Sequence, residues 1–475
     1  MERLSLRRGD TRRVAALVVL ALAALIAIVS ARDYAGGWND GSRLATVESL
    51  VDRHTLAIDD SIFVRVPPAH ESQASGPYPA DEPGLLQRGT LDKLFIDGHF
   101  YSDKSPVPAV LMAILYQVLQ WGAGLHARLD PGRFVYWMTI GASALAYVIA
   151  VWSVFQLGAP LRLPLHLRLS LTASFGLATL APVYARHVNN HIVLLGVAAA
   201  LLLGFARLAR ESQAGSVAGW RLLGLGTLAG LGYTIDLGAG PLLMISALTL
   251  VAVRRPGLRA PTIFLLGALP WLVLHHTLNY AIGGTFRPAN AVPEYLMWPG
   301  SPFTPGDMTG SWSHESVGHF VAYALAMLFG KRGFFGHNLP LFLTLPAVVT
   351  LLRRRAPEHL EILAGLGWAA GTWLLYAATS TNSSGVAASI RWFLPLLAPA
   401  YYLLAVFLRE HPKHRMDFLV LGGWGIVLTS LIWWAGPWMK RMAPFFWPLQ
   451  AAALLTWLLM WAWRRREEQK RVEAG

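Results

Sequence analysis

The sequence predicts an all-α protein that crosses a membrane many times. Of its 475 residues, 54% are hydrophobic and only 14% are charged, and the mean hydropathy is +0.43. Soluble domains are closer to one quarter charged. Several apolar runs also reach the roughly 20 residues that a helix needs to cross a bilayer. These observations together define a polytopic helical membrane protein.

About thirteen apolar runs follow one another along the chain, and short basic loops separate them. Basic loops face the cytoplasm in most membrane proteins. The clusters lie at Arg162/Arg168, Arg207/Arg210, Arg254/Arg255/Arg259, Arg353/Arg354/Arg355, Lys413/Arg415 and Arg464/Arg465/Arg466. All of them fall on the same side as the basic N-terminus only if the run at 106–124 does not cross. We therefore expect about 12 transmembrane helices, both termini in the cytoplasm, and a juxtamembrane or re-entrant helix at 106–124.

Charge and cysteine content exclude several classes of protein. The net charge is +13, but its basic residues lie in short loops between apolar runs, so we expect no nucleic-acid partner. The chain has no Cys, which excludes disulfides, thiolate nucleophiles and Cys-ligated metals. The N-terminus resembles a signal peptide with a weak cleavage site, and we interpret it as an uncleaved first span. Lys440 and Arg441 lie in a short loop on the expected outer side, and the charge rule does not explain them.

The chain divides into two expected parts. Residues 1–410 form a transmembrane module with outer loops at 32–133 and 281–337, and residues 411–475 form a C-terminal transmembrane hairpin with a basic cytoplasmic tail. The first outer loop begins with "WNDGSRLATVESLVDRH", whose apolar residues recur at helical spacing. We expect an amphipathic helix on the membrane surface here, followed by an exposed Pro/Gly/Ser-rich loop in "VPPAHESQASGPYPADEPG". A second such helix is expected at "VGHFVAYALAMLFG".

This topology places the polar residues that lie between spans on the outer side. They are Asp40, Asp103, Lys104, the segment "RHVNNH" from Arg186 to His191, Asp236 and Arg391. The sequence has no Gly-rich nucleotide loop, no HExxH and no GxSxG. It also has no soluble domain large enough for a nucleotide site. If the protein is an enzyme, its substrates therefore arrive through the membrane.

The order of several short motifs points to a family. The acidic "WNDGSRLATVESL" is followed by "YSDKSPVPAVL", "YARHVNNHIVL", "GLGYTIDLGAGPLL", "NYAIGGTFRP", "GKRGFFGHNLPLFL" and "SIRWFLPLLAP". This arrangement resembles the GT-C class of integral-membrane glycosyltransferases, near the protein O-mannosyltransferases and the lipid A aminoarabinose transferases. The resemblance covers most of residues 10–410. Two departures are Ser105, which stands between the Lys and the Pro of the family pattern, and Asn189, Asn190 and His191, which stand where many members have an Asp.

The resemblance implies transfer of a sugar from a polyprenyl-phosphate donor at the outer leaflet. A carboxylate base must accept the proton of the attacking hydroxyl, and Asp40 stands where the family has its base. Cations must stabilise the departing lipid phosphate, which implicates Lys104 with Arg391 and Arg186. Direct displacement inverts the anomeric centre, so one carboxylate suffices. The remaining outer polar residues are expected substrate contacts: Asp103, His187, His191 and Asp236.

Each of these residues also has a purely structural interpretation. Asp40 could cap its helix, Lys104 and Arg391 could anchor the chain at the interface, and the Arg186–His191 turn could be a polar connection. His187 and His191 are four residues apart and could chelate a divalent cation if the turn were helical, but we assign no metal ligands.

Our leading hypothesis is an inverting glycosyltransferase of the bacterial inner membrane, with a glycan, lipid or protein acceptor. The alternatives are a multi-span transporter or lipid flippase and a non-catalytic scaffold. Transporters usually show matching halves and broken helices at mid-bilayer, and this sequence shows neither.

Overall fold

The computed structural model describes residues 2–67, 76–213, 218–304, 307, 310–439 and 441–473. Lys440 and part of the Pro-rich outer loop, residues 68–75, therefore lie outside the described residues. The regular secondary structure of the described chain is helical, apart from one two-stranded hairpin. The long helices are α1 (Glu2–Ser30), α4 (Pro106–Ala123), α5 (Pro131–Thr139) continuing through η1 (Ile140–Ala144) into α6 (Leu145–Leu157), α9 (Asn190–Gln213), α10 (Gly219–Ile235), α11 (Ala239–Arg254), α12 (Arg259–Gly283), α16 (His359–Thr379), α17 (Leu397–Glu410), α18 (Arg415–Ala435) and α19 (Phe446–Glu473). Shorter helices are α2 (Trp38–Asp52), α3 (Pro83–Arg88), α7 (Leu165–Leu177), α8 (Ala181–Tyr184), α13 (Val317–Phe329), α14 (Phe334–His337) and α15 (Thr344–Arg354).

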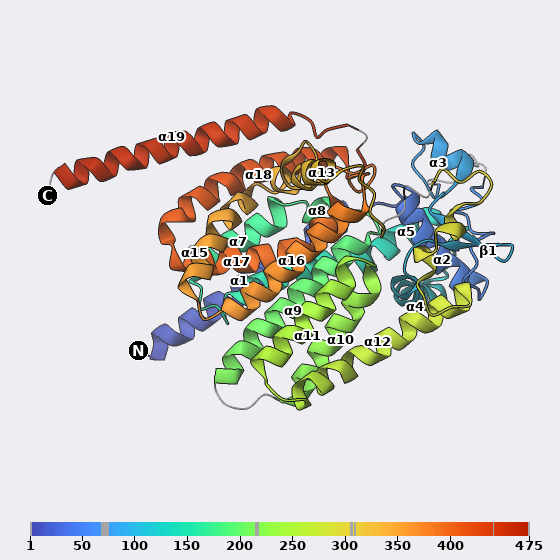
Figure 1. Cartoon of the computed structure of the whole chain (residues 1–475), viewed down its shortest axis with the longest axis horizontal. Helices are drawn as coiled ribbons and strands as arrows, with labels where there is room; N and C mark the ends of the chain where they lie inside the picture. The colour runs from blue at the N-terminus through green and yellow to red at the C-terminus, as the bar shows by residue number, and fades with distance from the viewer. Residues whose placement is uncertain are drawn as a thin grey trace.

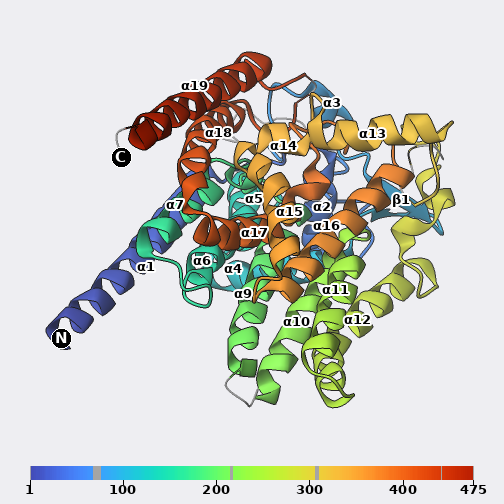
Figure 2. The ribbon, with the colours of Figure 1, turned by 60° about the vertical axis from the view of Figure 1, so that its left-hand side comes forward.

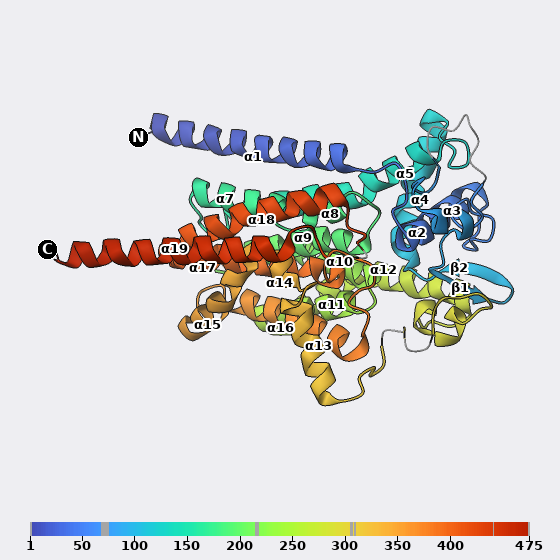
Figure 3. The same ribbon diagram turned by 90° about the horizontal axis from the view of Figure 1, so that it is seen from above.

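The long helices form a bundle, and both chain termini lie at the same end of it (Figures 1 and 3). The first outer loop, with α2, α3 and the β-hairpin, gathers at the opposite end. Within the described residues, eight helices are long and apolar enough to cross a membrane, or nine if the bent pair Val317–His337 and Leu339–Arg354 is one span. The predicted all-α polytopic membrane fold is confirmed. The count of about twelve spans stays a prediction, because α10 and α11 have only 17 and 16 residues.

Glycines allow the closest helix packing in the bundle. A Cβ atom added to Gly226 would lie 1.8 Å from the carbonyl oxygen of Phe264, and one added to Gly267 would lie 2.1 Å from that of Leu223. α10 and α12 therefore touch backbone to backbone. Small residues drive helix association in membranes in the same way, because lipid offers no hydrophobic advantage between helices.

Helix α4 corresponds to the run that we expect not to cross the membrane. Pro106 and Pro108 lie in its first turn, where the absent N–H groups would have no helical partner, and Gly124 ends it in a left-handed conformation with φ 61°. Its length and composition would allow a span. In Figures 1 and 3, however, it lies beside α2 at the end of the bundle that carries the first outer loop. Its non-crossing topology stays a prediction.

The structure corrects our prediction for the first outer helix. We expected α2 to lie on the membrane surface, but residues 40–49 are all buried. Even Glu48 is fully buried. There it accepts hydrogen bonds from the Ser61 hydroxyl at 2.5 Å and from Arg53 at 3.1 Å. The outer loop folds over α2, so polar residues on the helix face protein rather than water.

A tight β-hairpin brings two acidic segments together. β1 (Lys93–Ile96) and β2 (His99–Ser102) are antiparallel, and Lys93 pairs with Ser102. The turn residues Asp97 and Gly98 both have positive φ, 49° and 88°, as expected for the Asp-Gly turn of a two-residue hairpin. Because the strands end in register, Asp92 and Asp103 are adjacent at the open end of the hairpin.

Candidate functional site

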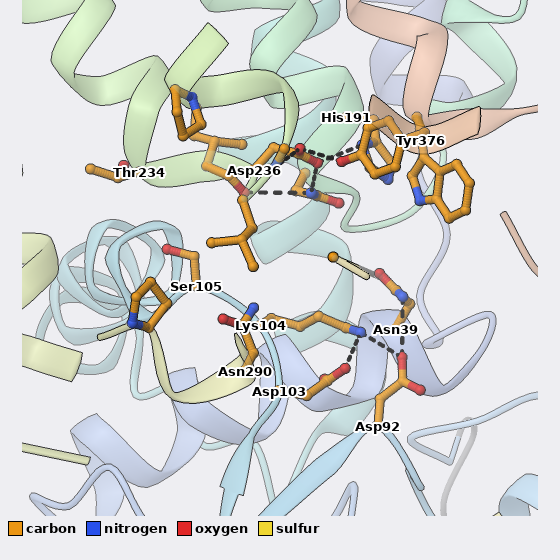
Figure 4. Close-up of a pocket in the computed structure, with 18 of the residues that line it drawn as sticks. Asn39, Asp92, Asp103, Lys104, Ser105, His191, Thr234, Asp236, Asn290 and Tyr376 are labelled. Carbon is orange, nitrogen blue, oxygen red and sulfur yellow. Dashed lines mark hydrogen bonds and ion pairs between the residues drawn. The ribbon is translucent and has the colours of Figure 1, made fainter. Parts of the chain in front are cut away.

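A cavity of about 400 Å³ lies where the first outer loop meets the helix bundle (Figure 4). One wall comes from α2 and the ends of the β-hairpin. The other comes from the start of α9, the α10–α11 turn and the segment around Tyr376 and Arg391. Part of the second outer loop, near Asn290 and Asp307, also borders the cavity.

Lys104 occupies the α2 side of the cavity between two carboxylates. Its Nζ lies 2.8 Å from Oδ2 of Asp92 and 2.5 Å from Oδ2 of Asp103, as Figure 4 shows. Burial raises the pKa of Asp103 and the nearby charge of Asp92 adds to this, although Lys104 opposes both effects. Asn39 also donates a hydrogen bond to Oδ2 of Asp92 at 3.1 Å. The ammonium is therefore already neutralised by protein groups.

Two arginines line the cavity with no carboxylate within 4 Å, as far as the chain is described. Arg43 lies one turn after Asn39 on α2 and donates to the side-chain oxygens of Asn39 and Asn190, at 2.5 and 2.8 Å. The Arg391 guanidinium lies over the Trp438 ring, 5.4 Å from its centroid, and its Nε has no hydrogen-bond partner. Arg43 is buried and Arg391 is half-buried, and a guanidinium without an acidic partner in such a place is costly, so both side chains are suited to an anionic ligand.

Asp236 organises the opposite wall of the cavity. Its Oδ1 accepts the Tyr376 hydroxyl at 2.6 Å and the backbone N–H of Ala239 at 2.8 Å. Its Oδ2 accepts the Asn190 amide at 3.2 Å and lies 3.3 Å from Nδ1 of His191. Burial alone would raise the pKa of Asp236, but His191, and after it the Tyr376 hydroxyl and the Ala239 N–H, lower it to about 2. Asp236 is thus a fixed anion that positions its neighbours.

Asp40 lies directly behind the cavity rather than on its surface. It is fully buried in the first turn of α2, and it is not among the residues that line the cavity. Its Oδ2 accepts the Gly36 N–H at 2.9 Å, while its Oδ1 has no hydrogen-bond partner. Burial raises its pKa to about 7, although Arg43 and Arg391 lower it. A carboxylate with a free oxygen and a pKa near neutrality is suited to accept a proton.

The structure brings some of the predicted site residues together and leaves others outside. Lys104, Asp103, His191, Asp236 and Arg391 all line this cavity. Asp40, Arg186 and His187 do not.

His187 packs between the Tyr34 and Trp438 rings, with Nδ1 3.7 Å from Asp40. Burial and the adjacent Arg186 lower the pKa of His187 to about 3, so it is neutral. Arg186 instead lies over the Trp433 ring, 4.9 Å from its centroid.

The sequence reasoning missed several polar residues of the cavity, among them Arg43, Asp92 and Asn190. Arg43 follows Asp40 by three residues, so helical spacing alone puts both near one face of α2. Asp92 could have been found from the Asp-Gly hairpin signal, which predicts that the segments flanking the strands converge. Asn190 was noted as a departure from the family pattern but not assigned. No three His, Asp or Glu side chains in the described chain are placed to hold a metal ion.

Comparison with solved structures confirms the GT-C-like fold that the sequence resemblance implied. No family model matches the chain, and no curated protein matches it by sequence. The chain is similar to ArnT from Cupriavidus metallidurans bound to undecaprenyl phosphate, with a TM-score of 0.50 and 15% identity over 88% of this chain and 64% of that chain.

The apo form of the same ArnT has a TM-score of 0.49 and 15% identity over 88% of this chain and 63% of that chain. An apo oligosaccharyltransferase from Archaeoglobus fulgidus has a TM-score of 0.44 and 13% identity over 92% and 56%. The present chain therefore spans less than two thirds of the length of these proteins. At such low identity the likeness is one of fold alone.

Proposed function

We propose that this protein is an inverting glycosyltransferase that moves a sugar from a polyprenyl-phosphate donor to an acceptor hydroxyl. The observation that carries the proposal is the single cavity that holds Lys104, Arg43 and Arg391 beside several carboxylates. Cations suit the departing lipid phosphate, and carboxylates suit the acceptor proton and the sugar hydroxyls. The similar fold of ArnT, whose solved structure is bound to undecaprenyl phosphate, supports a polyprenyl-phosphate donor.

The donor phosphate is assigned to Arg391 and Arg43 first and to Lys104 second. The two arginines have no carboxylate partner among the described residues, whereas Lys104 has two within 2.8 Å. A phosphate binding at the arginines would gain charge-assisted hydrogen bonds without breaking an ion pair. It could recruit Lys104 as its negative charge grows during departure of the sugar. Arg186 lies outside this cavity, so we do not assign it to the donor.

Asp40 is assigned as the general base. Its free Oδ1 and its pKa of about 7 favour proton transfer near neutral pH. Its neighbours Asn39 and Arg43 on α2 line the cavity, so the proposed role requires the Asp40 side chain to turn toward the cavity when an acceptor binds. His187 lies beside it, with Nδ1 3.7 Å from Oδ2 of Asp40, and the Trp438 ring packs against the His187 ring. Both are neutral, which leaves the carboxylate basic.

Asp103 is the second candidate for the base, and one observation favours it. Unlike Asp40, it lines the cavity, and burial raises its pKa. Its Oδ2, however, is held by Lys104 at 2.5 Å, and its Oδ1 accepts the Ser42 hydroxyl at 3.2 Å. Both oxygens are therefore occupied, whereas Asp40 has one free.

The test compares Asp40→Asn with Asp103→Asn in the purified, reconstituted protein. Release of polyprenyl phosphate is measured with a panel of polyprenyl-phosphate monosaccharides and acceptors. Asp40→Asn should lower kcat by roughly 10²–10⁴-fold, as expected for a positioned base. Binding of undecaprenyl phosphate should survive, because it depends on the cations. Asp103→Asn should lower kcat by much less.

The opposite ranking of the two variants would move the base to Asp103. If no panel member releases polyprenyl phosphate while undecaprenyl phosphate still binds, a lipid transporter or flippase becomes the better account. The exposed Asp81 lies on the same outer loop, and Asp81→Asn serves as the matched control for handling and expression.

The proposed membrane is the bacterial inner membrane, with the cavity on the outer face and both termini in the cytoplasm. The termini lie at the end of the bundle opposite the first outer loop, as this topology requires (Figure 1). The absence of Cys makes single-cysteine labelling simple. A cysteine at Pro160 should react only from the cytoplasmic side, and one near Ala123 only from the outer side.

A further inference from the structure

A second groove lies on the bundle, away from the cavity. It has a volume of about 590 Å³ and runs between α1, α8 and α18. Its walls include Leu25, Ile26 and Val29 on α1 and Trp433 and Trp434 on α18. Figure 2 shows α1 at the edge of the bundle. The groove therefore opens toward the region that lipid occupies.

Two arginines lie next to the Ser30 and Trp433 end of this groove, although neither is among the residues that line it. Arg32 follows the end of α1, and its backbone N–H donates to the carbonyl oxygen of Arg186 at 2.9 Å. Arg186 donates from Nη1 to the carbonyl oxygen of Trp433, a residue of the groove wall. The Trp433 indole N–H in turn donates to the Ser30 hydroxyl at 3.0 Å, which also lines the groove. Hydrogen bonds therefore connect Arg32 to Arg186, Arg186 to Trp433, and Trp433 to Ser30 on the groove wall.

The two arginines have unfilled bonding capacity. Arg186 is only 2% exposed, and neither its Nε nor that of Arg32 has a hydrogen-bond partner. No carboxylate in the described part of the chain lies within ion-pair distance of either guanidinium. Burial and then the neighbouring charge of Arg32 lower the pKa of Arg186 to about 10. Two like charges in contact with apolar surface require an anion to offset them.

Hydroxyl groups lie one helical turn deeper in the groove. Thr429 is four residues before Trp433 on α18, which corresponds to about 6 Å along the axis. Thr429 is 2% exposed, and its Oγ1 has no hydrogen-bond partner; Ser430 lies beside it on the groove wall. Below them the groove is lined by apolar side chains. Tryptophans at membrane interfaces mark the headgroup level, so the arginines lie at the depth of lipid phosphates.

We propose that this groove binds an anionic glycerophospholipid, with its phosphate on the half-buried Arg32, attracted also by the charge of the buried Arg186, and with its ester carbonyl at Thr429 and Ser430. The order of groups along the groove is cation, hydroxyl donor and apolar wall. A glycerophospholipid presents phosphate, ester carbonyl and acyl chain in the same order. A polyprenyl phosphate carries no ester, so it would leave the Thr429 hydroxyl without a partner. The site is separate from the cavity, because the groove and the cavity share no lining residue.

The test measures retention of phosphatidylglycerol by the full-length protein in detergent, by native mass spectrometry during titration. Arg32→Gln and Arg186→Gln should each weaken binding by about five- to tenfold, as expected when one basic residue at a lipid surface is removed. Ser430→Trp should weaken binding by filling the groove without touching the arginines. Arg32 is half-buried and Ser430 is exposed, so these variants should fold even if the buried Arg186→Gln does not.

The matched control is Arg287→Gln, because Arg287 is an exposed arginine in the second outer loop, outside the groove. It should retain phosphatidylglycerol as the unmodified protein does, and phosphatidylcholine should bind more weakly than phosphatidylglycerol. Equal retention by Arg32→Gln, Ser430→Trp and the control would overturn the proposal. So would loss of undecaprenyl phosphate instead of phosphatidylglycerol, which would make the groove a second carrier-lipid site. Neither result depends on whether the protein transfers sugar.

Discussion

The two ends of the bundle both bury charged residues but pair them in opposite ways. At the end that carries the chain termini, Arg254 donates to both oxygens of Glu361, at 2.9 and 2.5 Å, and Arg409 donates to both oxygens of Glu358, at 2.7 and 2.9 Å. At the cavity end, Arg43 and Arg391 have no such partner among the described residues, and one oxygen of Asp40 is free.

The difference separates a structural use of charge from a functional one. In a bidentate ion pair, the guanidinium and the carboxylate neutralise each other and form hydrogen bonds to each other, so neither charge is available to a ligand. Unpaired buried groups cost stability, and proteins keep them where a ligand or a reaction completes them. If this interpretation is right, substitutions at the two ends should have different consequences.

The largest expected effect is at the paired end. Glu361→Gln removes the charge that compensates Arg254 and should destabilise the fold by up to about 3–5 kcal/mol. Arg254 keeps some contact with solvent, since 17% of its side chain is exposed, and this should limit the loss. Unfolding followed by intrinsic Trp fluorescence in detergent measures the Tm. The double variant Glu361→Gln/Arg254→Met should recover most of the loss, whereas a double variant as unstable as the single one would contradict the structural role.

At the unpaired end, Arg391→Ala should lower the rate of transfer with little change in Tm. Removing one preorganised donor to a developing anion costs about 10²–10³-fold in rate. No carboxylate loses its ion pair, so stability should hold. The measurement pairs kcat and undecaprenyl phosphate affinity with Tm on the same preparation. A large drop in Tm with unchanged turnover per folded molecule would make Arg391 a structural residue like Arg254.

Parts of this contrast could be predicted from the sequence. Hydropathy predicted the all-α membrane class, and the order of short motifs predicted the GT-C fold. The structure places five of the predicted site residues around one cavity, and their roles stay predictions: Lys104, Asp103, His191, Asp236 and Arg391.

The placement of the remaining residues could not be predicted in this way. Arg186 and His187 share the short turn with His191, but a turn directs successive side chains in different directions, and only His191 reaches the cavity. Asp92 lies in a segment of no obvious pattern until the Asp97–Gly98 hairpin is recognised. The burial of α2 depends on how the outer loop folds over it, a long-range contact that helical periodicity does not contain.

The pH dependence gives a smaller effect with a defined sign. Transfer needs ionised Asp40, so kcat should fall about tenfold for each pH unit below its pKa of about 7. Stability should change in the opposite direction. Because burial raises the pKa of Asp40 above its unfolded value of 3.8, the folded state binds the extra proton, and stability declines as pH rises from about 4 through 7.

Asp40→Asn should remove both trends at once. The variant should be as stable as the unmodified protein near pH 4 and more stable above pH 7, and its residual activity should lose the acidic limb. Tm profiles between pH 4 and 9 and kcat profiles between pH 5 and 9 measure this. An acidic limb that persists in Asp40→Asn but disappears in Asp103→Asn would assign the titrating base to Asp103.

The smallest expected effect tests whether the Lys104 ammonium is held by its carboxylate partners for structure or is available to a ligand. Asp92 and Asp103 both hold its ammonium, so a donor phosphate must compete with them. Asp92→Asn removes one competitor while Asp103 still positions the lysine, and the affinity for undecaprenyl phosphate should rise by roughly two- to tenfold, in the range expected for a single partly exposed ion pair. A titration of undecaprenyl phosphate on the purified protein measures this, with Asp81→Asn as the control. If the affinity falls instead, Asp92 orients Lys104 for the phosphate rather than competing with it, and Lys104 would act as part of a fixed triad.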